Sequence, residues 1–310
     1  MARSINRAIN LVGRGRATGK NPAQSLSTAQ ALAGRLPPLV VEAIRIADTV
    51  ASGAHGRRRA GPGDSFWQFR PYVSGDTAQA IDWRVSARSD QLFVREREWS
   101  AAASLYLWRD ASASMRWRGA RDRQSKQERA DLLLLSLAAL AIRGEEQVAI
   151  LGLDKRGRQG RGALTHLAQA IGQGKDESLP PEGPLPRQAD LVLFSDFFSP
   201  LDELAARLGI LAARSARGLM VQIYDPAEAA LPFEGRVRFE GLEGEGRWLA
   251  PRVETLRPAY IERFRDHQSA LAGLAASLGW RFVALPTDRP AASALAALHA
   301  GLAPGLRGTA

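Results

Sequence analysis

The sequence predicts an α/β fold in which a mostly parallel sheet is flanked by helices. Short apolar runs, each about as long as a buried strand, recur at 101–107, 147–153, 190–196, 219–225 and 280–285. Segments with helical spacing of leucine and alanine lie between several of these runs. Strands that alternate with helices are joined by right-handed crossovers, so the alternation indicates a parallel sheet.

Four helices are expected around this sheet, at 129–142, 165–171, 269–278 and 291–302. The first has the clearest apolar spacing, which is carried by Leu132, Leu133, Leu135 and Leu140. A helix with one apolar face is stable only when that face packs against another element, so we expect these helices to cover the sheet.

We expect four segments along the chain. Residues 1–24 form a basic flexible tail, and residues 25–55 form a helical segment that docks on the sheet domain. Residues 56–100 form a small β-rich subdomain, because aromatic residues are frequent there and favour strands; the alternative is an aromatic surface for single-stranded nucleic acid. Residues 101–310 form the sheet domain, with a hairpin insertion near 233–250 where polar and apolar residues alternate.

The composition excludes several classes of protein. The chain of 310 residues contains no cysteine, which rules out disulfides and thiolate metal sites. Its four histidines show no paired ligand spacing, which argues against a zinc enzyme. No apolar run approaches the roughly 20 residues of a membrane span, and no signal peptide is evident. We therefore expect a cytoplasmic protein without an integral membrane segment.

The net charge of +10 is concentrated near the N-terminus. Residues 1–62 hold ten lysines and arginines against two acidic residues, a balance of +8. Such a region, which includes Arg57, Arg58 and Arg59, suits nucleic acid or an anionic surface. The alternative is a tail that only keeps the protein soluble.

The stretch Asp110-Ala111-Ser112-Ala113-Ser114 follows the first apolar run of the sheet domain. In open α/β sheets, ligands bind outside the carboxyl ends of the strands. The three polar side chains place hard oxygen atoms on one loop, and Mg²⁺ and Mn²⁺ prefer such ligands. Because few of these ligands are carboxylates, the bound ion would keep an open coordination position, which an acidic side chain of a partner would fill. The alternative is a helix-capping turn.

Asp196 ends the apolar run 190–196 and supports the metal interpretation. If the two strands are neighbours, the carboxylates of Asp110 and Asp196 meet at one edge of the sheet. We therefore expect Asp110, Ser112, Ser114 and Asp196 to converge and to bind Mg²⁺ or Mn²⁺ weakly. Nearby arginines would steer an acidic partner towards this site, namely Arg109, Arg116 and Arg118.

These strands and polar residues resemble the von Willebrand factor type A fold. Its metal site combines an Asp-x-Ser-x-Ser loop, a threonine from a second loop and an aspartate from a third. The resemblance implies that Asp110, Ser112, Ser114 and Asp196 are metal ligands, and it makes Thr165 the candidate threonine. Thr165 is equally suited to be a helix N-cap, since the Gly-Gly-Thr spacing is missing. The antiparallel edge hairpin of that fold would be reduced to residues 155–161.

The block of residues that precedes the Asp110–Ser114 loop, which we call the metal loop, makes the resemblance more specific. The block contains Gly75-Asp76, Ile81-Asp82-Trp83 and Ala87-Arg88, in this order, just ahead of the Asp-x-Ser-x-Ser strand. This order is similar to the bacterial family numbered fifty-eight among the domains of unknown function. The resemblance implies an adaptor or chaperone-like partner of a MoxR-type AAA+ ATPase. Within the block, we expect Asp82 and Arg88 to form an ion pair.

Three classes of function follow. The favoured class is a non-enzymatic, metal-dependent protein-interaction module. The second is a protein that binds nucleic acid or an anionic surface through its basic N-terminal region. The third is a metal-dependent hydrolase, but phosphoryl-transfer enzymes with an Asp nucleophile need a carboxylate where Ser112 stands. The chain also lacks a Gly-x-Ser-x-Gly elbow and a Walker loop.

Overall fold

The computed structural model describes residues 38–52, 66–73, 81–89, 91–97, 104–173, 177–187, 189–242 and 246–302. The chain divides into two compact units, which are considered separately. Unit 1 comprises residues 1–54 and 104–310, and unit 2 comprises residues 55–103. The basic stretch 1–24 and the arginines at 57–59 lie outside the described residues.

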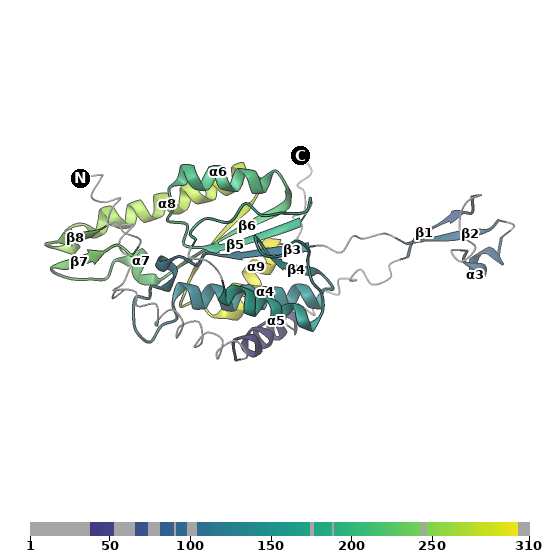
Figure 1. Ribbon diagram of the computed structural model, residues 1–310, viewed down its shortest axis with the longest axis horizontal. Coiled ribbons are helices and arrows are strands. Elements are labelled where there is room, and N and C mark those ends of the chain that lie inside the picture. The colour runs from purple at the N-terminus through teal and green to yellow at the C-terminus, as the bar shows by residue number, and fades with distance from the viewer. Residues whose placement is uncertain are drawn as a thin grey trace. The chain divides into compact units, whose positions relative to one another are not determined.

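A five-stranded sheet forms the centre of unit 1 (Figure 1). Its strands are β3 (Ser104–Arg109), β4 (Gln147–Ile150), β5 (Ala189–Ser195), β6 (Ser215–Tyr224) and β9 (Arg281–Pro286). All neighbours pair in parallel, and the order is β4-β3-β5-β6-β9. The predicted parallel α/β fold is confirmed. The chain passes from β3 to β4 on one side and then returns to β5 on the other side of β3, so a topological switch point lies between the carboxyl ends of β3 and β5.

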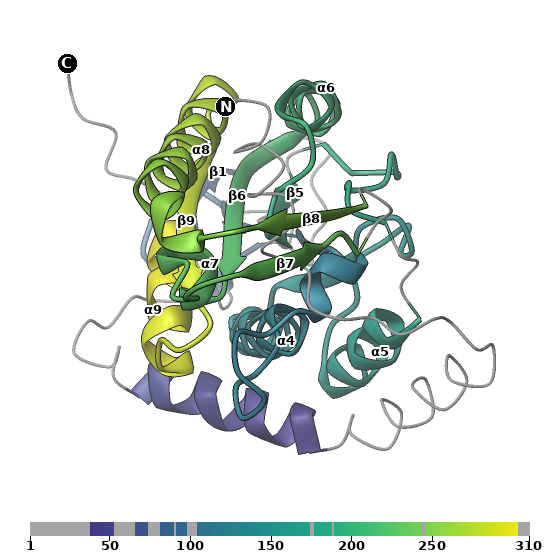
Figure 2. The same ribbon diagram turned by 90° about the vertical axis from the view of Figure 1, so that its left-hand side faces the viewer.

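Helices cover both faces of the sheet (Figure 2). One face packs against α4 (Lys126–Arg143), α5 (Arg161–Gly172) and α9 (Ala291–Leu302), and the helix at 38–52 belongs to the same apolar cluster. The other face packs against α6 (Leu201–Ala212) and α8 (Arg257–Ser277). The pleat of the strands explains this division, since Leu107 lies in the first apolar layer and Trp108 in the second.

Several helices differ from their expected bounds. α4 begins at Lys126, because the Ser125 hydroxyl and the Glu128 carboxylate form a capping box that starts the helix there. α8 begins at Arg257 rather than at 269, since Tyr260 and Phe264 in its first turns are buried in an apolar cluster. α6 was not expected, yet it supplies the crossover that two parallel strands require.

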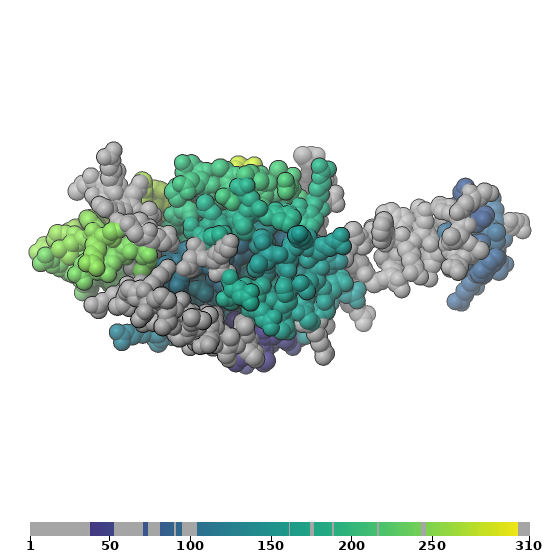
Figure 3. Space-filling model, viewed as in Figure 1, coloured from purple at the N-terminus to yellow at the C-terminus, as the bar shows by residue number. Residues whose placement is uncertain are grey.

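A hairpin follows β6 (Figure 1), and its part of the chain forms the light-green surface at the left of the space-filling view (Figure 3). After the short helix α7 (Pro226–Ala230), β7 (Val237–Glu240) pairs with β8 (Arg247–Ala250) in antiparallel register. Phe239 stacks on Trp248 across the two strands and packs in the same cluster as Tyr260 of α8. The hairpin is therefore anchored to α8 by aromatic packing.

The outer edge of β4 carries one antiparallel bridge, between Val148 and Arg158. Each of the two residues donates its backbone N–H to the carbonyl of the other, at 2.9 Å. The bridge lies within residues 155–161, to which the edge hairpin was expected to be reduced. In the part of the chain that the structure describes, each helix is either too short or too polar to span a lipid bilayer.

Unit 2 contains an antiparallel pair of strands, β1 (Phe66–Pro71) and β2 (Phe93–Arg97), and the short helix α3 (Trp83–Ser86). The carboxylate of Asp82 caps α3 by accepting hydrogen bonds from the backbone N–H groups of Arg84 and Val85, at 3.1 Å each. Asp82 thus has a local capping role in place of the expected ion pair with Arg88, because the nearest donors are those of the helix start.

Candidate metal centre

Asp110 and Asp196 follow β3 and β5, which are neighbours in the sheet. Arg109 is in register with Phe194, and the backbone N–H of Asp110 donates to the Phe194 carbonyl at 2.8 Å. Both aspartates therefore leave the sheet at the same edge, at the switch point. The structure brings together these two carboxylates, as expected from the apolar runs that precede them.

The Asp110 loop is held by short hydrogen bonds. Asp110 Oδ1 accepts from the backbone N–H of Ser112 at 2.8 Å, and Oδ2 accepts from the Ser195 hydroxyl at 2.6 Å. The hydroxyls of Ser112 and Ser114 lie 3.0 Å apart, and Ser114 contributes to lowering the pKa of Asp196. The three hydroxyls and the two carboxylates thus lie together in one polar group.

Ser112 of the Asp110–Ser114 loop does not use its side chain to cap the turn that follows it, contrary to the helix-capping alternative. A 3₁₀ turn, Ala113–Arg116, follows it, and Ser112 stands at the N-cap position of that turn. Its side chain nevertheless makes no capping hydrogen bond, because the hydroxyl is directed to Ser114 instead. The Ser112 hydroxyl is therefore used within the polar group and not to start the turn.

All four side chains are buried. Asp110 is 1% exposed, while Ser112, Ser114 and Asp196 are each 3% exposed. Burial makes ionised carboxylates costly unless a cation or hydrogen bonds compensate them. It also means that a partner's acidic side chain does not reach these atoms in this arrangement.

Lys126 supplies a cation that the sequence analysis missed. Its side chain is fully buried, with Nζ 2.9 Å from Asp196 Oδ2 and 2.5 Å from Glu228 Oε1. The ammonium also lies 5.3 Å from the centre of the Phe198 ring, within range of a cation–π contact. The Ser125-x-x-Glu128 pattern of a capping box would have predicted from the sequence that the helix begins at Lys126.

The buried ionisable side chains at this site shift one another's pKa values; they are Asp110, Lys126, Asp196 and Glu228. Burial and the neighbouring Asp196 raise the pKa of Asp110 to about 7, and burial raises the pKa of Glu228 to about 7 in spite of Lys126. Burial acts in the same sense on Asp196, but Lys126 outweighs it and lowers the pKa of Asp196. The two carboxylates raise the pKa of Lys126 against the effect of burial. This cluster therefore holds one ammonium and three carboxyl groups, of which Asp196 and Glu228 contact the ammonium.

Helix α8 braces the segment that follows Asp196. The backbone carbonyl of Asp196 accepts from the Gln222 amide at 3.1 Å, and Gln268 of α8 donates to Gln222 at 2.9 Å. His267 of α8 hydrogen-bonds to the Phe197 carbonyl at 2.9 Å. Phe197 has a φ of 53°, which is a strained conformation for a bulky residue. The packing against α8 holds this strained turn beside the polar group.

Thr165 is placed differently from the other candidate ligands. It is exposed and lies in the second turn of α5, whose N-cap is Gly160. The N-cap interpretation of Thr165 is wrong, because Gly160, at a φ of 76°, is the N-cap and the helix begins at Arg161. Its neighbour His166 hydrogen-bonds to Asp154 at 2.8 Å.

Arg109 also differs from its expected role of steering a partner. Its side chain is buried and forms an ion pair with Asp131 at 2.7 Å. A second guanidinium nitrogen donates to the Ile171 carbonyl at 2.8 Å. Arg109 thus joins β3 to α4 and α5, whereas Arg116 and Arg118 are exposed. The pleat places the Arg109 side chain under the helices, because it occupies the last position of a buried strand.

The donor set fits a hard divalent cation. Each carboxylate oxygen of Asp110 accepts one hydrogen bond and retains a further lone pair. No group of three or more histidine, aspartate or glutamate side chains forms a metal site within the described part of the chain, so an ion here depends on Ser112 and Ser114. Hydroxyl and carboxylate oxygens suit Mg²⁺ and Mn²⁺.

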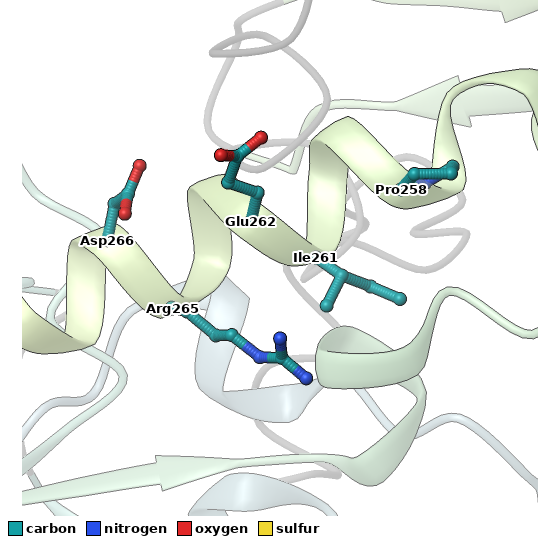
Figure 4. Close-up of a pocket in the computed structure, with 5 residues that line it drawn as sticks. All are labelled: Pro258, Ile261, Glu262, Arg265 and Asp266. Atoms are coloured by element: carbon teal, nitrogen blue, oxygen red, sulfur yellow. The ribbon is translucent and has the colours of Figure 1, made fainter.

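A surface pocket on α8 is a separate feature (Figure 4). It is lined by Pro258, Ile261, Glu262, Arg265 and Asp266. All five residues belong to α8, and none of them belongs to the polar group at the switch point. The pocket therefore offers no additional ligand to the candidate metal centre.

Comparison with known proteins gives a family but no activity. The model of the family described as "Protein of unknown function DUF58" matches residues 68–270. Similar proteins are the uncharacterized proteins Mb1516 of Mycobacterium bovis and Rv1480 of Mycobacterium tuberculosis, each 25% identical over 282 residues. These matches cover 83% of this chain and 86% of each relative. No solved structure matches the chain.

The family match spans the polar group described above. It begins in β1 of unit 2 and ends within α8, so it includes Asp110, Lys126, Asp196 and Glu228. It covers more than half of the 310 residues. The chain belongs to the DUF58 family of proteins of unknown function.

Proposed function

We propose that this protein is a non-enzymatic protein-interaction module whose centre binds Mg²⁺ or Mn²⁺. One observation carries the proposal: Asp110, Ser112, Ser114 and Asp196 converge at the switch point between β3 and β5. This is the position at which open α/β sheets bind ligands. The exposed Thr165 is left out of the proposed ligand set.

The proposed ligands come from two separate strands. Asp110, Ser112 and Ser114 follow β3, Asp196 follows β5, and the Ser195 hydroxyl orients the Asp110 carboxylate. When bound, the ion would supply a fixed positive charge that joins the ends of these strands. Because the site is buried, these residues would set the conformation of the surrounding surface to which a partner binds.

The side chains around the centre argue against catalysis. The Ser195 hydroxyl donates to Asp110 and accepts from the backbone N–H of Phe197, so it is held in place at both positions. Among the described residues, His166 pairs with Asp154 and His267 with the Phe197 carbonyl rather than with a serine hydroxyl. A nucleophile activated by a base is thus not assembled here.

The partner class that we propose is a MoxR-type AAA+ ATPase, which rests on the family resemblance. Exposed arginines of the segment after the metal loop, Arg116 and Arg118, would attract an acidic surface of such a partner. The buried position of Asp110 and Ser112 means that the partner contacts the surface above the centre and not the ion itself.

Co-purification from the native host tests this function. We expect the wild type to retain its partner in Mg²⁺ and to lose it in EDTA, and Ser112→Ala to lose it in both. Ser136→Ala is the matched control, since Ser136 is a buried serine whose hydroxyl donates to the Leu132 carbonyl within α4. Equal retention under all conditions would make the centre structural. Salt-dependent DNA binding that survives Asp110→Ala would instead favour the basic N-terminal region.

A further inference from the structure

Lys126 stands in an unusual position for a lysine. It is the first residue of α4, where the helix dipole disfavours a positive charge, and it has no exposed surface. Burying an ammonium is costly unless carboxylates compensate it. The side chain is held there by Asp196, which follows β5, and by Glu228 of α7.

The Lys126 ammonium is hydrogen-bonded to a carboxylate oxygen of Asp196 that a metal would need as a ligand. Asp196 Oδ1 accepts from the backbone N–H of Phe198 at 3.2 Å, while Oδ2 accepts from Lys126. An ion bound between Asp110 and Asp196 would therefore meet a positive charge already bonded to one of its ligands. At such short range, in a buried site, two cations repel each other strongly.

Glu228 offers Lys126 a second partner outside the proposed ligand set. Its Oε1 accepts from Lys126, and its Oε2 accepts from the backbone N–H of Asp225 at 2.8 Å. Glu228 is thus fixed in position at the start of α7, and the Phe198 ring lies beside the ammonium. If Lys126 loses Asp196, it keeps a carboxylate and a cation–π contact, so its charge stays compensated.

We propose that Lys126 is the internal cation of this centre, and that a divalent ion displaces its ammonium from Asp196 towards Glu228. This inference rests on the proposed function, since it requires that the centre binds a metal. The ammonium stays protonated throughout, so the exchange transfers one ionic contact and no proton. Competition by this built-in charge would make metal binding weak, which is the affinity expected for the proposed centre.

Titration with Mn²⁺, followed by electron paramagnetic resonance of the free ion, tests the exchange on the full chain. We expect Lys126→Met to bind Mn²⁺ at least about tenfold more tightly than the wild type, because the competitor is gone. Lys155→Met is the matched control, since Lys155 is exposed, and its affinity should equal that of the wild type. Equal affinity of Lys126→Met and the wild type would overturn the inference.

The double variant Lys126→Met/Glu228→Gln separates exchange from net charge. It removes one positive and one negative group, so the balance of the cluster is unchanged, and loss of both partners of a buried pair is tolerated better than loss of one. We expect it also to bind Mn²⁺ more tightly than the wild type. Tighter binding in the single variant alone would overturn the inference, because it would be an effect of net charge.

The variant Asp110→Asn separates a failure of the proposed metal site from a failure of the proposed Lys126 exchange. If the wild type binds Mn²⁺, Asp110→Asn does not, and both Lys126 variants match the wild type, the metal centre stands and the exchange is wrong. If neither the wild type nor a Lys126 variant binds Mn²⁺, both the exchange and the proposed metal are wrong. Circular dichroism of each variant shows that it is folded.

Discussion

Two buried ion clusters adjoin the carboxyl end of β3, and they differ in charge balance. In the first, Arg109 pairs with Asp131 at 2.7 Å. Its other nitrogens donate to the carbonyls of Ile171 and Asp110. One cation thus meets one carboxylate, and two further guanidinium nitrogens donate to backbone carbonyls. The pair is balanced in charge and joins three elements of the fold.

The second cluster is unbalanced. The Lys126 ammonium contacts Asp196 and Glu228, and the carboxyl group of Asp110 couples to that of Asp196. The acidic excess requires either bound protons or a further cation. The comparison teaches that a buried ion pair of balanced charge serves the fold, whereas a buried cluster with an excess of carboxyl groups beside the Ser112 and Ser114 hydroxyls is suited to a ligand.

The largest expected effect comes from the balanced pair. Arg109→Met should lower the free energy of unfolding by about 3–5 kcal/mol, because Asp131 is left buried without its partner. Urea unfolding in Mg²⁺ and in EDTA should show the same loss. The control is Arg143→Met, which breaks an exposed pair with Asp48 and should cost no more than about 1 kcal/mol. Recovery of Arg109→Met in Mg²⁺ would contradict the comparison.

The unbalanced cluster should respond to metal instead. Lys126→Met should lower the free energy of unfolding by about 3 kcal/mol in EDTA, because Asp196 and Glu228 lose their cation. Part of this loss should return in Mg²⁺, since the bound ion replaces the missing charge. The same urea series measures it. An equal loss of unfolding free energy in EDTA and in Mg²⁺ would show that Lys126, like Arg109, stabilises the fold and does not respond to metal.

A smaller effect is expected from Ser195, which connects the two strand ends. Ser195→Ala removes the donor to Asp110 and the acceptor for the backbone N–H of Phe197. Leaving a buried polar group without its partner should cost about 1–3 kcal/mol. Affinity for Mn²⁺ should also fall, because the Asp110 carboxylate is no longer oriented. Unchanged Mn²⁺ affinity would assign Ser195 to the fold alone.

The smallest effect is a pH dependence of the balanced pair. Burial raises the pKa of Asp131 against the opposing effect of Arg109. A carboxyl group whose pKa is raised by folding contributes its stability fully below its unfolded pKa and loses it as the pH rises through its folded pKa. Relative to Asp131→Asn, the wild type should therefore become less stable as the pH rises above about 4. Urea unfolding across this range measures the difference, and an opposite slope would contradict it.

Much of the centre follows from local sequence patterns. The apolar runs before Asp110 and Asp196 predicted two buried strands, and parallel strands place their carboxyl ends at one edge. Thr165 was misplaced, because the start of α5 depends on the backbone conformation of Gly160, which the residue spacing does not reveal. α6 was missed, although the crossover between β5 and β6 requires an element there.

The sequence by itself determined the α/β class, the strands of the sheet and the positions of Asp110 and Asp196, because periodicity and strand ends depend on near neighbours along the chain. Only the tertiary structure decided which charges are buried. Lys126 lies 70 residues from Asp196 and 102 from Glu228, and a lysine at a helix start is ordinarily exposed. Desolvation of this lysine results from packing between distant segments, and that packing makes its charge a competitor for the proposed metal.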